Sequence, residues 1–201
     1  MRITQLDFGA RLLKFVLNFR RSVISLICTL WYRLVSIIVG INLGRGVAFN
    51  GRILLERFKY STINIGDNCV FNSNSLFNPR GTKRCILHTA TDFAKIEIGN
   101  NCGFSGVSIV AWNSVKIGNN VMVGADTCIG DTDDHPERLG TETAPVEIKD
   151  NVFIGMHCLI LKGVTIGENS IIGAGSVVTK DIPANCIAAG VPCKVIRYLG
   201  K

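Results

Sequence analysis

The stretch IKDNVFIGMHCLILKGVTIGENSIIGAGSVVTKDI, residues 148–182, repeats with a period of six. A branched aliphatic residue stands at every sixth position: Ile148, Ile154, Ile160, Ile166, Ile172 and Val178. A helix repeats every 3.6 residues and a strand every two, so neither explains this spacing. The spacing predicts a solenoid in which each hexad is a short strand and a turn, and three hexads close one triangular coil.

The same spacing extends toward the N-terminus with interruptions. It predicts interior side chains at Ile98, Phe104 and Val110 and then, after a one-residue slip at Lys116, at Ile117, Val123 and Ile129. A weaker set, Ile65, Phe71 and Phe77, precedes an irregular segment near residues 82–97. We therefore predict an all-β chain with a parallel β-helix over residues 42–183 and a C-terminal tail over residues 184–201.

The composition is that of one folded domain. Hydrophobic residues make up 47% of the 201 residues and charged residues only 18%, which excludes a disordered chain. Residues 1–40 carry +5 of the net charge of +7, so the body of the protein offers no nucleic-acid-binding surface. The eight cysteines include no CxxC pair, and we expect small, buried, free thiols in a reducing, cytoplasmic compartment.

Residues 1–41 are predicted to form a basic amphipathic helix that ends near Gly40. Polar residues recur every three or four positions at Arg11, Lys14, Asn18, Arg21, Ser25, Thr29, Arg33 and Ser36, which gives the helix one polar face. The longest uncharged run, Ser22 to Tyr32, is shorter than the roughly 20 apolar residues that cross a bilayer. Two interpretations stay open: peripheral contact of residues 10–40 with anionic lipid at the inner face of the plasma membrane, or packing of the apolar face on the protein or another subunit.

The period is abandoned between Ile129 and Ile148, and residues 131–146 are predicted to form a loop. This loop holds His135 among four carboxylates, those of Asp131, Asp133, Asp134 and Glu137. An imidazole titrates near neutrality and can take a proton from a hydroxyl and return it. His135 is therefore the candidate catalytic residue, and the alternative is an exposed histidine in a solvated acidic loop.

These features resemble the hexapeptide-repeat acyltransferases. IGNNVMVGADTCIG, residues 117–130, followed by a polar loop with DHP, is similar to the galactoside, maltose and polysaccharide O-acetyltransferase branch. The resemblance implies a left-handed β-helix and a homotrimer with active sites between adjacent β-helices. It also implies that His135 is the general base that activates a sugar hydroxyl for attack on the thioester of acetyl-CoA.

The segment GAGSVVTKDIPANCIAAGVPCKVIR, residues 173–197, carries the closest match to the family. The resemblance implies that coenzyme A is bound by Ala174, Thr179, Lys180, Lys194, Arg197 and Met156. Met156 stands where relatives commonly have a small residue. The acceptor-binding residues implied in the same way are Ser105, Trp112 and Asn113, although the chain lacks the paired acidic residues of the galactoside enzymes.

The expected activity is acetyl-CoA-dependent O-acetylation, by direct transfer, of a sugar hydroxyl in a surface polysaccharide or its lipid-linked intermediate. No metal site is expected, because the loop has no second histidine near His135 and structural roles are more usual for His88 and His157. Two alternatives remain: an acetyltransferase for a soluble small molecule such as serine or an antibiotic, and a β-helical scaffold without chemistry. The sequence identifies neither the acceptor nor the acyl chain length.

Overall fold

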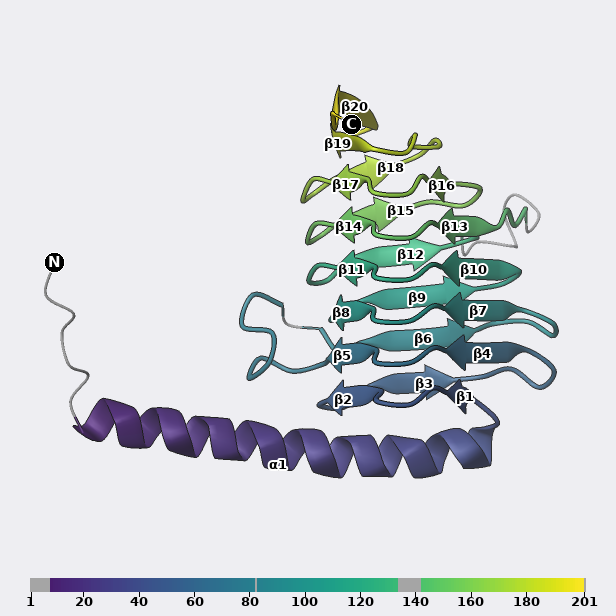
Figure 1. Cartoon of the computed structure of the whole chain (residues 1–201). Coiled ribbons are helices and arrows are strands. Elements are labelled where there is room, and N and C mark those ends of the chain that lie inside the picture. Colours follow the sequence, from purple (N-terminus) through teal and green to yellow (C-terminus); the bar gives the residue numbers. More distant parts are fainter. Residues whose placement is uncertain (1–7, 82, 134–141, 201) are drawn as a thin grey trace, which may run out of the picture.

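The computed structural model describes residues 8–81, 83–133 and 142–200 and confirms a left-handed parallel β-helix with an N-terminal helix (Figure 1). Helix α1 (Phe8–Val39) runs across the base of a stack of coils. Each coil contributes one strand to each of three sheets, which form the three sides of a prism.

The three sheets are named A, B and C here in the order in which the chain visits them. Sheet A contains β1 (Asn42–Leu43), β4 (Thr62–Ile65), β7 (Lys95–Ile98), β10 (Ser114–Ile117), β13 (Val146–Ile148) and β16 (Thr165–Ile166). Sheet B contains β2 (Ala48–Asn50), β5 (Val70–Asn72), β8 (Gly103–Ser105), β11 (Met122–Val123), β14 (Phe153–Ile154), β17 (Ile171–Ile172), β19 (Cys186–Gly190) and β20 (Cys193–Tyr198). Sheet C contains β3 (Leu54–Glu56), β6 (Ile86–Thr89), β9 (Ser108–Ala111), β12 (Cys128–Gly130), β15 (Leu159–Ile160) and β18 (Val177–Val178). The strands pair in parallel, except that β20 returns antiparallel to β19.

The core consists of columns of equivalent side chains, one from each coil. The six residues at the repeating aliphatic position of the stretch 148–182 are all at most 1% exposed, which confirms the period of six. Near the base, the sheet B column is aromatic: the rings of Phe49, Phe71 and Phe104 stack at centroid distances of 5.3 and 5.0 Å. Burial of each ring contributes about 2–3 kcal/mol, and the stack fixes the register of the lower coils.

Val110 is one of two interior positions, with Phe77, that were predicted wrongly. Ile109, not Val110, is buried in β9, and it pairs with Ile129 of β12, while Val110 lies half-buried opposite Gly130. The corner before β9 is one residue shorter than the period of six requires. Gly106 makes this corner with a φ of +58°, a conformation that costs glycine little.

The prediction of an irregular segment at 82–97 was also wrong. Residues 86–89 and 95–98 form the regular strands β6 and β7, and the chain instead leaves the coil between β5 and β6 (Figure 1). Phe77 therefore lies half-buried in this excursion and not in the core. The Asn74 side chain holds the start of the excursion, because its Oδ1 accepts hydrogen bonds from the backbone N–H groups of Leu76 and Phe77.

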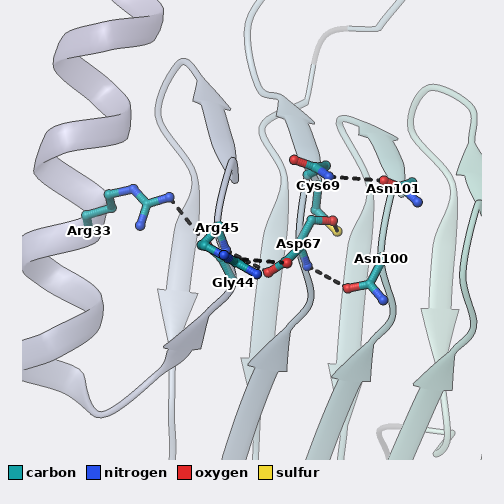
Figure 2. A network of polar contacts seen from close by, with 8 residues as sticks. Arg33, Gly44, Arg45, Asp67, Cys69, Asn100 and Asn101 are labelled. Carbon is teal, nitrogen blue, oxygen red and sulfur yellow. Dashed lines mark hydrogen bonds and ion pairs between the residues drawn. The ribbon is translucent and has the colours of Figure 1, made fainter.

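A ladder of asparagines lines the edge between sheets A and B. Asn68, Asn101, Asn120, Asn151, Asn169 and Asn185 all have φ between +56° and +58°. Each side chain below Asn185 donates a hydrogen bond to the next one up the stack, at distances of 2.9 to 3.3 Å. Asparagine tolerates this left-handed conformation better than other residues with side chains, and here the ladder also satisfies its amide. Figure 2 shows the lowest rung, which ends at Asn101, beside the hydrogen bond that the Asp67 backbone N–H donates to Asn100 Oδ1.

Helix α1 is joined to the coils by its polar face. The Phe49 N–H donates to Thr29 Oγ1 at 2.9 Å, the Tyr32 hydroxyl donates to the Ile53 carbonyl at 2.8 Å, and Arg33 reaches the Gly44 carbonyl (Figure 2). Over residues 29–36 the polar face of α1 is therefore turned toward the first coil. By length and composition, the stretch Ala10–Val39 qualifies as a candidate membrane span.

Candidate active site

The described ends of the loop 131–146 are held by a buried carboxylate. Asp131 has no exposed surface and accepts hydrogen bonds from three consecutive backbone N–H groups, those of Trp112, Asn113 and Ser114, at 2.8, 2.7 and 2.6 Å. Carboxylates bind such donors strongly. Asp131 thus fixes the edge between sheets C and A directly below the loop.

The two ends of the loop are also clamped to each other. Lys162 forms an ion pair with Asp133 at 2.6 Å and donates to the Glu142 carbonyl at 3.2 Å. The Ala144 N–H donates to the Asp131 carbonyl at 3.0 Å. The loop therefore leaves and rejoins the coil at one point. His135 lies outside the described residues, as do Asp134 and Glu137.

A groove runs along sheet B toward its edge with sheet C. Its upper part has a volume of about 550 Å³ and is lined by Arg80, Ser105, Met156 and Ala174, among others. A lower part of about 500 Å³ is lined by Asn72, Asn101 and Met122, among others, and shares Ser105, Gly124 and Phe153 with the upper part. We call the two parts together the sheet B groove.

Glycine makes the floor of this groove narrow. A Cβ atom on Gly155 would lie 2.5 Å from the backbone N of Ala174, and one on Gly124 would lie 2.6 Å from the backbone N of Met156. Both contacts are shorter than van der Waals distance, so any larger residue would push the coils apart. Ala174 itself is exposed at the rim, and the groove can hold an extended apolar chain along exposed backbone.

The structure divides the residues predicted to bind the donor between two edges. Met156 and Ala174 lie in the sheet B groove, and Lys194 and Arg197 lie on β20 at the top of sheet B. Thr179 and Lys180 follow β18 and therefore lie at the edge between sheets C and A, on the side of the loop. All four polar residues of this set are exposed.

The residues predicted to bind the acceptor are divided in the same way. Ser105 is in the sheet B groove. Trp112 and Asn113 lie at the edge between sheets C and A, where their backbone N–H groups donate to the carboxylate of Asp131. One chain does not bring the two groups together.

The residues that the excursion between β5 and β6, residues 73–85, adds to the groove were not predicted from the sequence. Arg80 supplies a cation to the upper part, and Asn78, 6% exposed, lines it with an Nδ2 that has no hydrogen-bond partner among the described residues. Pro79 and Gly81 flank Arg80, and both residue types favour turns. An excursion at this point could have been predicted from them.

Cys158 and Cys193, near the upper part of the groove, do not have the character of nucleophiles. Burial raises the pKa of the Cys158 thiol, whose sulfur donates to the Gly173 carbonyl at 3.2 Å. Burial also raises the pKa of the Cys193 thiol on β20. All eight cysteines are free, and six are buried, while Cys28 is half-buried and Cys128 is exposed.

The two described histidines lie away from the loop. His88 belongs to the regular strand β6, not to an irregular segment, and its Nδ1 lies 3.0 Å from Glu56 Oε2. His157 is exposed at a turn with a φ of +55°. Within residues 8–81, 83–133 and 142–200, no three His, Cys, Asp or Glu side chains are grouped to hold a metal ion.

Comparison with known proteins places these features in one family. The family model for the bacterial transferase hexapeptide matches residues 145–180, and that for the hexapeptide repeat of succinyl-transferase matches residues 114–130. A variant of AntD, an N-acyltransferase from Bacillus cereus solved in complex with dTDP and coenzyme A, has a TM-score of 0.65 at 20% identity, covering 81% of this chain and 86% of that one. This likeness shows the shared fold.

Two relatives are similar in sequence. The galactoside O-acetyltransferase of Escherichia coli K12 is 47% identical over 113 residues, 53% of this chain, and the chain spans only about half (55%) of that relative's length. The galactoside O-acetyltransferase of Lactococcus lactis is 36% identical over 160 residues, 73% of this chain and 75% of the relative. The chain belongs to the hexapeptide-repeat acetyltransferases, in the branch of the galactoside and maltose O-acetyltransferases.

Proposed function

We propose that the protein is an acetyl-CoA-dependent O-acetyltransferase that modifies a sugar hydroxyl of a surface polysaccharide or of its lipid-linked intermediate. The sheet B groove carries this proposal. It is narrow and largely apolar, as the pantetheine arm of coenzyme A requires, and Met156 and Ala174 line it within the segment that matches the family. Arg80, Lys194 and Arg197 are cations in or above it that can bind phosphate.

We further propose that each active site forms between two chains of a homotrimer. Thr179, Lys180, Trp112 and the loop lie on one edge of the prism, and the sheet B groove lies toward another. A neighbouring chain that sets its C–A edge against this groove would bring both groups of residues to one cleft. Closed rotational symmetry would then repeat the same site three times.

The proposed reaction is direct transfer with His135 as general base. His135 takes the proton of the acceptor hydroxyl as its oxygen attacks the thioester carbonyl, and backbone N–H groups stabilise the oxyanion. The C–S bond then breaks, and the imidazolium returns the proton to the leaving thiolate, which leaves coenzyme A and the acetylated sugar. Cys158 takes no part, because burial raises its pKa and keeps the thiol protonated.

Incubation with acetyl-CoA that carries a labelled acetyl group, across a panel of sugars and oligosaccharides, tests the activity. We expect label in a sugar ester and none in serine or aminoglycoside acceptors. Calorimetry with coenzyme A makes the test independent of the acceptor. A chain that binds no coenzyme A would be a scaffold, and label only in a small amine or amino acid would contradict the sugar assignment.

Removal of donor-binding cations should weaken binding rather than chemistry. Lys180→Ala and Arg197→Ala are each expected to raise the apparent KM for acetyl-CoA by about 5-fold or more, with kcat changed by less than about 2-fold, because each loses a contact made equally in ground and transition states. Steady-state kinetics measures both constants. Lys149→Ala, which removes a lysine paired with Glu147 on sheet A, is the matched control. An unchanged KM in both variants would contradict their assignment.

Mixed oligomers test whether the site is shared. His135→Ala removes the base, and Ala174→Trp fills the groove, so each variant should be inactive by itself. Equal amounts unfolded and refolded together should regain about a quarter of the wild-type activity, because random closed trimers pair an intact loop with an intact groove at one interface in four. No recovery, with mixed trimers verified by native mass spectrometry, would place the whole site within one chain.

A further inference from the structure

We propose that α1 docks the protein on an anionic lipid surface through a continuous apolar stripe. The stripe recurs every three or four residues along the helix, and its members are between 37% and 77% exposed: Leu12, Val16, Phe19, Val23, Ile27, Leu30, Leu34, Ile37 and Ile38. Soluble monomers seldom leave an apolar surface of this extent uncovered.

The orientation of α1 on the coils is the first argument. Thr29, Tyr32, Arg33 and the buried Ser36 occupy the side that faces the first coil, and they hydrogen-bond to it or to the helix backbone. A surface helix of a soluble protein does the reverse and packs its apolar face on the core. The first coil thus contacts the polar side of α1, and the apolar side of α1 stays exposed on the face away from the coils.

Charge is the second argument, and it selects the occupant. Helix α1 contains Arg11, Lys14, Arg20, Arg21 and Arg33 and no acidic residue. Arg20 flanks the stripe, and the other four cations lie on the polar face of α1. With the stripe in the acyl region, a helix of charge +5 then lies at the headgroups, where anionic lipid attracts it. Two α1 helices packed stripe to stripe would instead form a pair of charge +10 with no acidic residue in either helix, which disfavours a second copy as the occupant.

Contacts of the helix decide that it lies on the membrane and does not cross it. Residues 28–39 are fixed across the base of the coils, and a shallow depression lined by Arg21, Ser25 and Phe77, among others, brings residues 21–29 beside the excursion 73–85. Among the described residues of α1, residues 8–20 extend beyond these contacts with the coils. They span about 20 Å, less than the roughly 30 Å hydrocarbon core, and carry Arg11, Lys14 and Arg20.

This arrangement sets a height for the acetylation site, an inference that rests on the proposed function. With α1 in the plane of the membrane, the coils stack along its normal (Figure 1). Strand β12, which precedes the loop, is the fourth strand from the base in sheet C. Strand spacings of about 4.8 Å and a helix-to-sheet layer of about 10 Å place it about 25 Å above the helix axis. The acceptor is then a glycan hydroxyl several sugars away from its lipid anchor.

Vesicle flotation tests the docking without any acceptor. The full chain should float with vesicles of phosphatidylglycerol and phosphatidylethanolamine and not with phosphatidylcholine, and binding should weaken as salt is added. In the variant Trp112→Phe, Trp31 on α1 is the remaining tryptophan and is 59% exposed. Its fluorescence should shift to the blue on binding and be quenched by lipids brominated on their acyl chains.

Two sets of substitutions identify the surface that binds. Phe19→Ser with Leu30→Ser and Ile37→Ser should lower the bound fraction by about 10-fold or more. Arg11→Gln with Lys14→Gln and Arg21→Gln should weaken binding and flatten its salt dependence. The control replaces three lysines on or beside sheet A, Lys95, Lys116 and Lys149, with glutamine and should bind as the wild type does.

The outcomes separate docking from the proposed activity. Absence of flotation and of any Trp31 response, in a protein that transfers acetyl groups, would overturn the docking and leave the activity standing. Flotation in a protein that binds no coenzyme A would overturn the activity and the inferred height, and leave the docking standing. If the serine variants instead break up the oligomer, as measured by sedimentation, the stripe is an interface between copies and the proposal fails.

Discussion

His135→Ala is expected to lower turnover by about 100-fold or more while coenzyme A still binds with nearly unchanged affinity. The variant loses the group that takes the proton from the acceptor hydroxyl. It loses no described donor contact, because Met156 and Ala174 lie in the sheet B groove and not on the loop. Initial rates at saturating acetyl-CoA, together with calorimetric titration of coenzyme A, measure the two effects separately.

The control for this variant is His88→Gln. His88 pairs with Glu56 on sheet C, two coils below the strand that precedes the loop, and has no part in the proposed chemistry. Its activity and melting temperature should remain close to those of the wild type. Full activity of His135→Ala would remove this residue from the mechanism, and a parallel loss of coenzyme A binding would show that the substitution disturbs the groove.

Asp131→Ala is expected to lower the free energy of unfolding by about 3 kcal/mol and to reduce activity as well. The buried carboxylate accepts three backbone hydrogen bonds at 2.8 Å or less, and its removal leaves those N–H groups without their acceptor. The edge that carries Trp112 and Asn113 would then lose its support. Urea denaturation gives the stability, and kinetics at a temperature where the variant is folded gives the activity.

Asp133→Ala is the matched control, because it removes a carboxylate from the same loop. Asp133 pairs with Lys162, but about half of its side chain is exposed, and an ion pair of this kind contributes only about 0.2–1 kcal/mol. We expect it to be the milder variant by at least about 2 kcal/mol. Equal losses for the two variants would mean that Asp131 acts as an ordinary surface charge.

The coils could be predicted because one physical rule generates them. Each buried aliphatic residue of a hexad packs against its equivalent in the coils above and below. An aliphatic residue is therefore needed at every sixth position, and residues 148–182 have one there. The prediction failed where the number of residues per corner changes, as it does before Ile109. A glycine corner that is one residue shorter leaves the aliphatic character of the sequence intact, and both Ile109 and Val110 fit the pattern until the pairing is known.

The candidate site was predictable residue by residue but not as an arrangement. The resemblance to the family predicted that Met156 and Lys180 both bind coenzyme A. The fold shows that they lie on different edges of the prism. The role of Asp131 was missed because a carboxylate next to a histidine suggests a catalytic partner, whereas its three acceptor bonds are to backbone of the preceding coil. Such a contact between distant residues leaves no trace in local sequence.

The orientation of α1 could not be predicted for a related reason. The alternation of polar and apolar residues predicts a helix with two faces but does not say which face the protein covers. That choice depends on hydrogen-bonding groups in the first coil, such as the backbone of Phe49 and Ile53, which meet Thr29 and Tyr32.

A crystal structure of the full chain with coenzyme A bound tests the central claim most directly. We predict a trimer in which the pantetheine arm lies in the sheet B groove against Met156 and Ala174 of one chain. Its sulfur should lie about 3–4 Å from the His135 imidazole of the next chain, the distance that direct transfer requires. Coenzyme A bound outside this groove, or a His135 imidazole about 10 Å or more from the sulfur in every chain, would contradict the account.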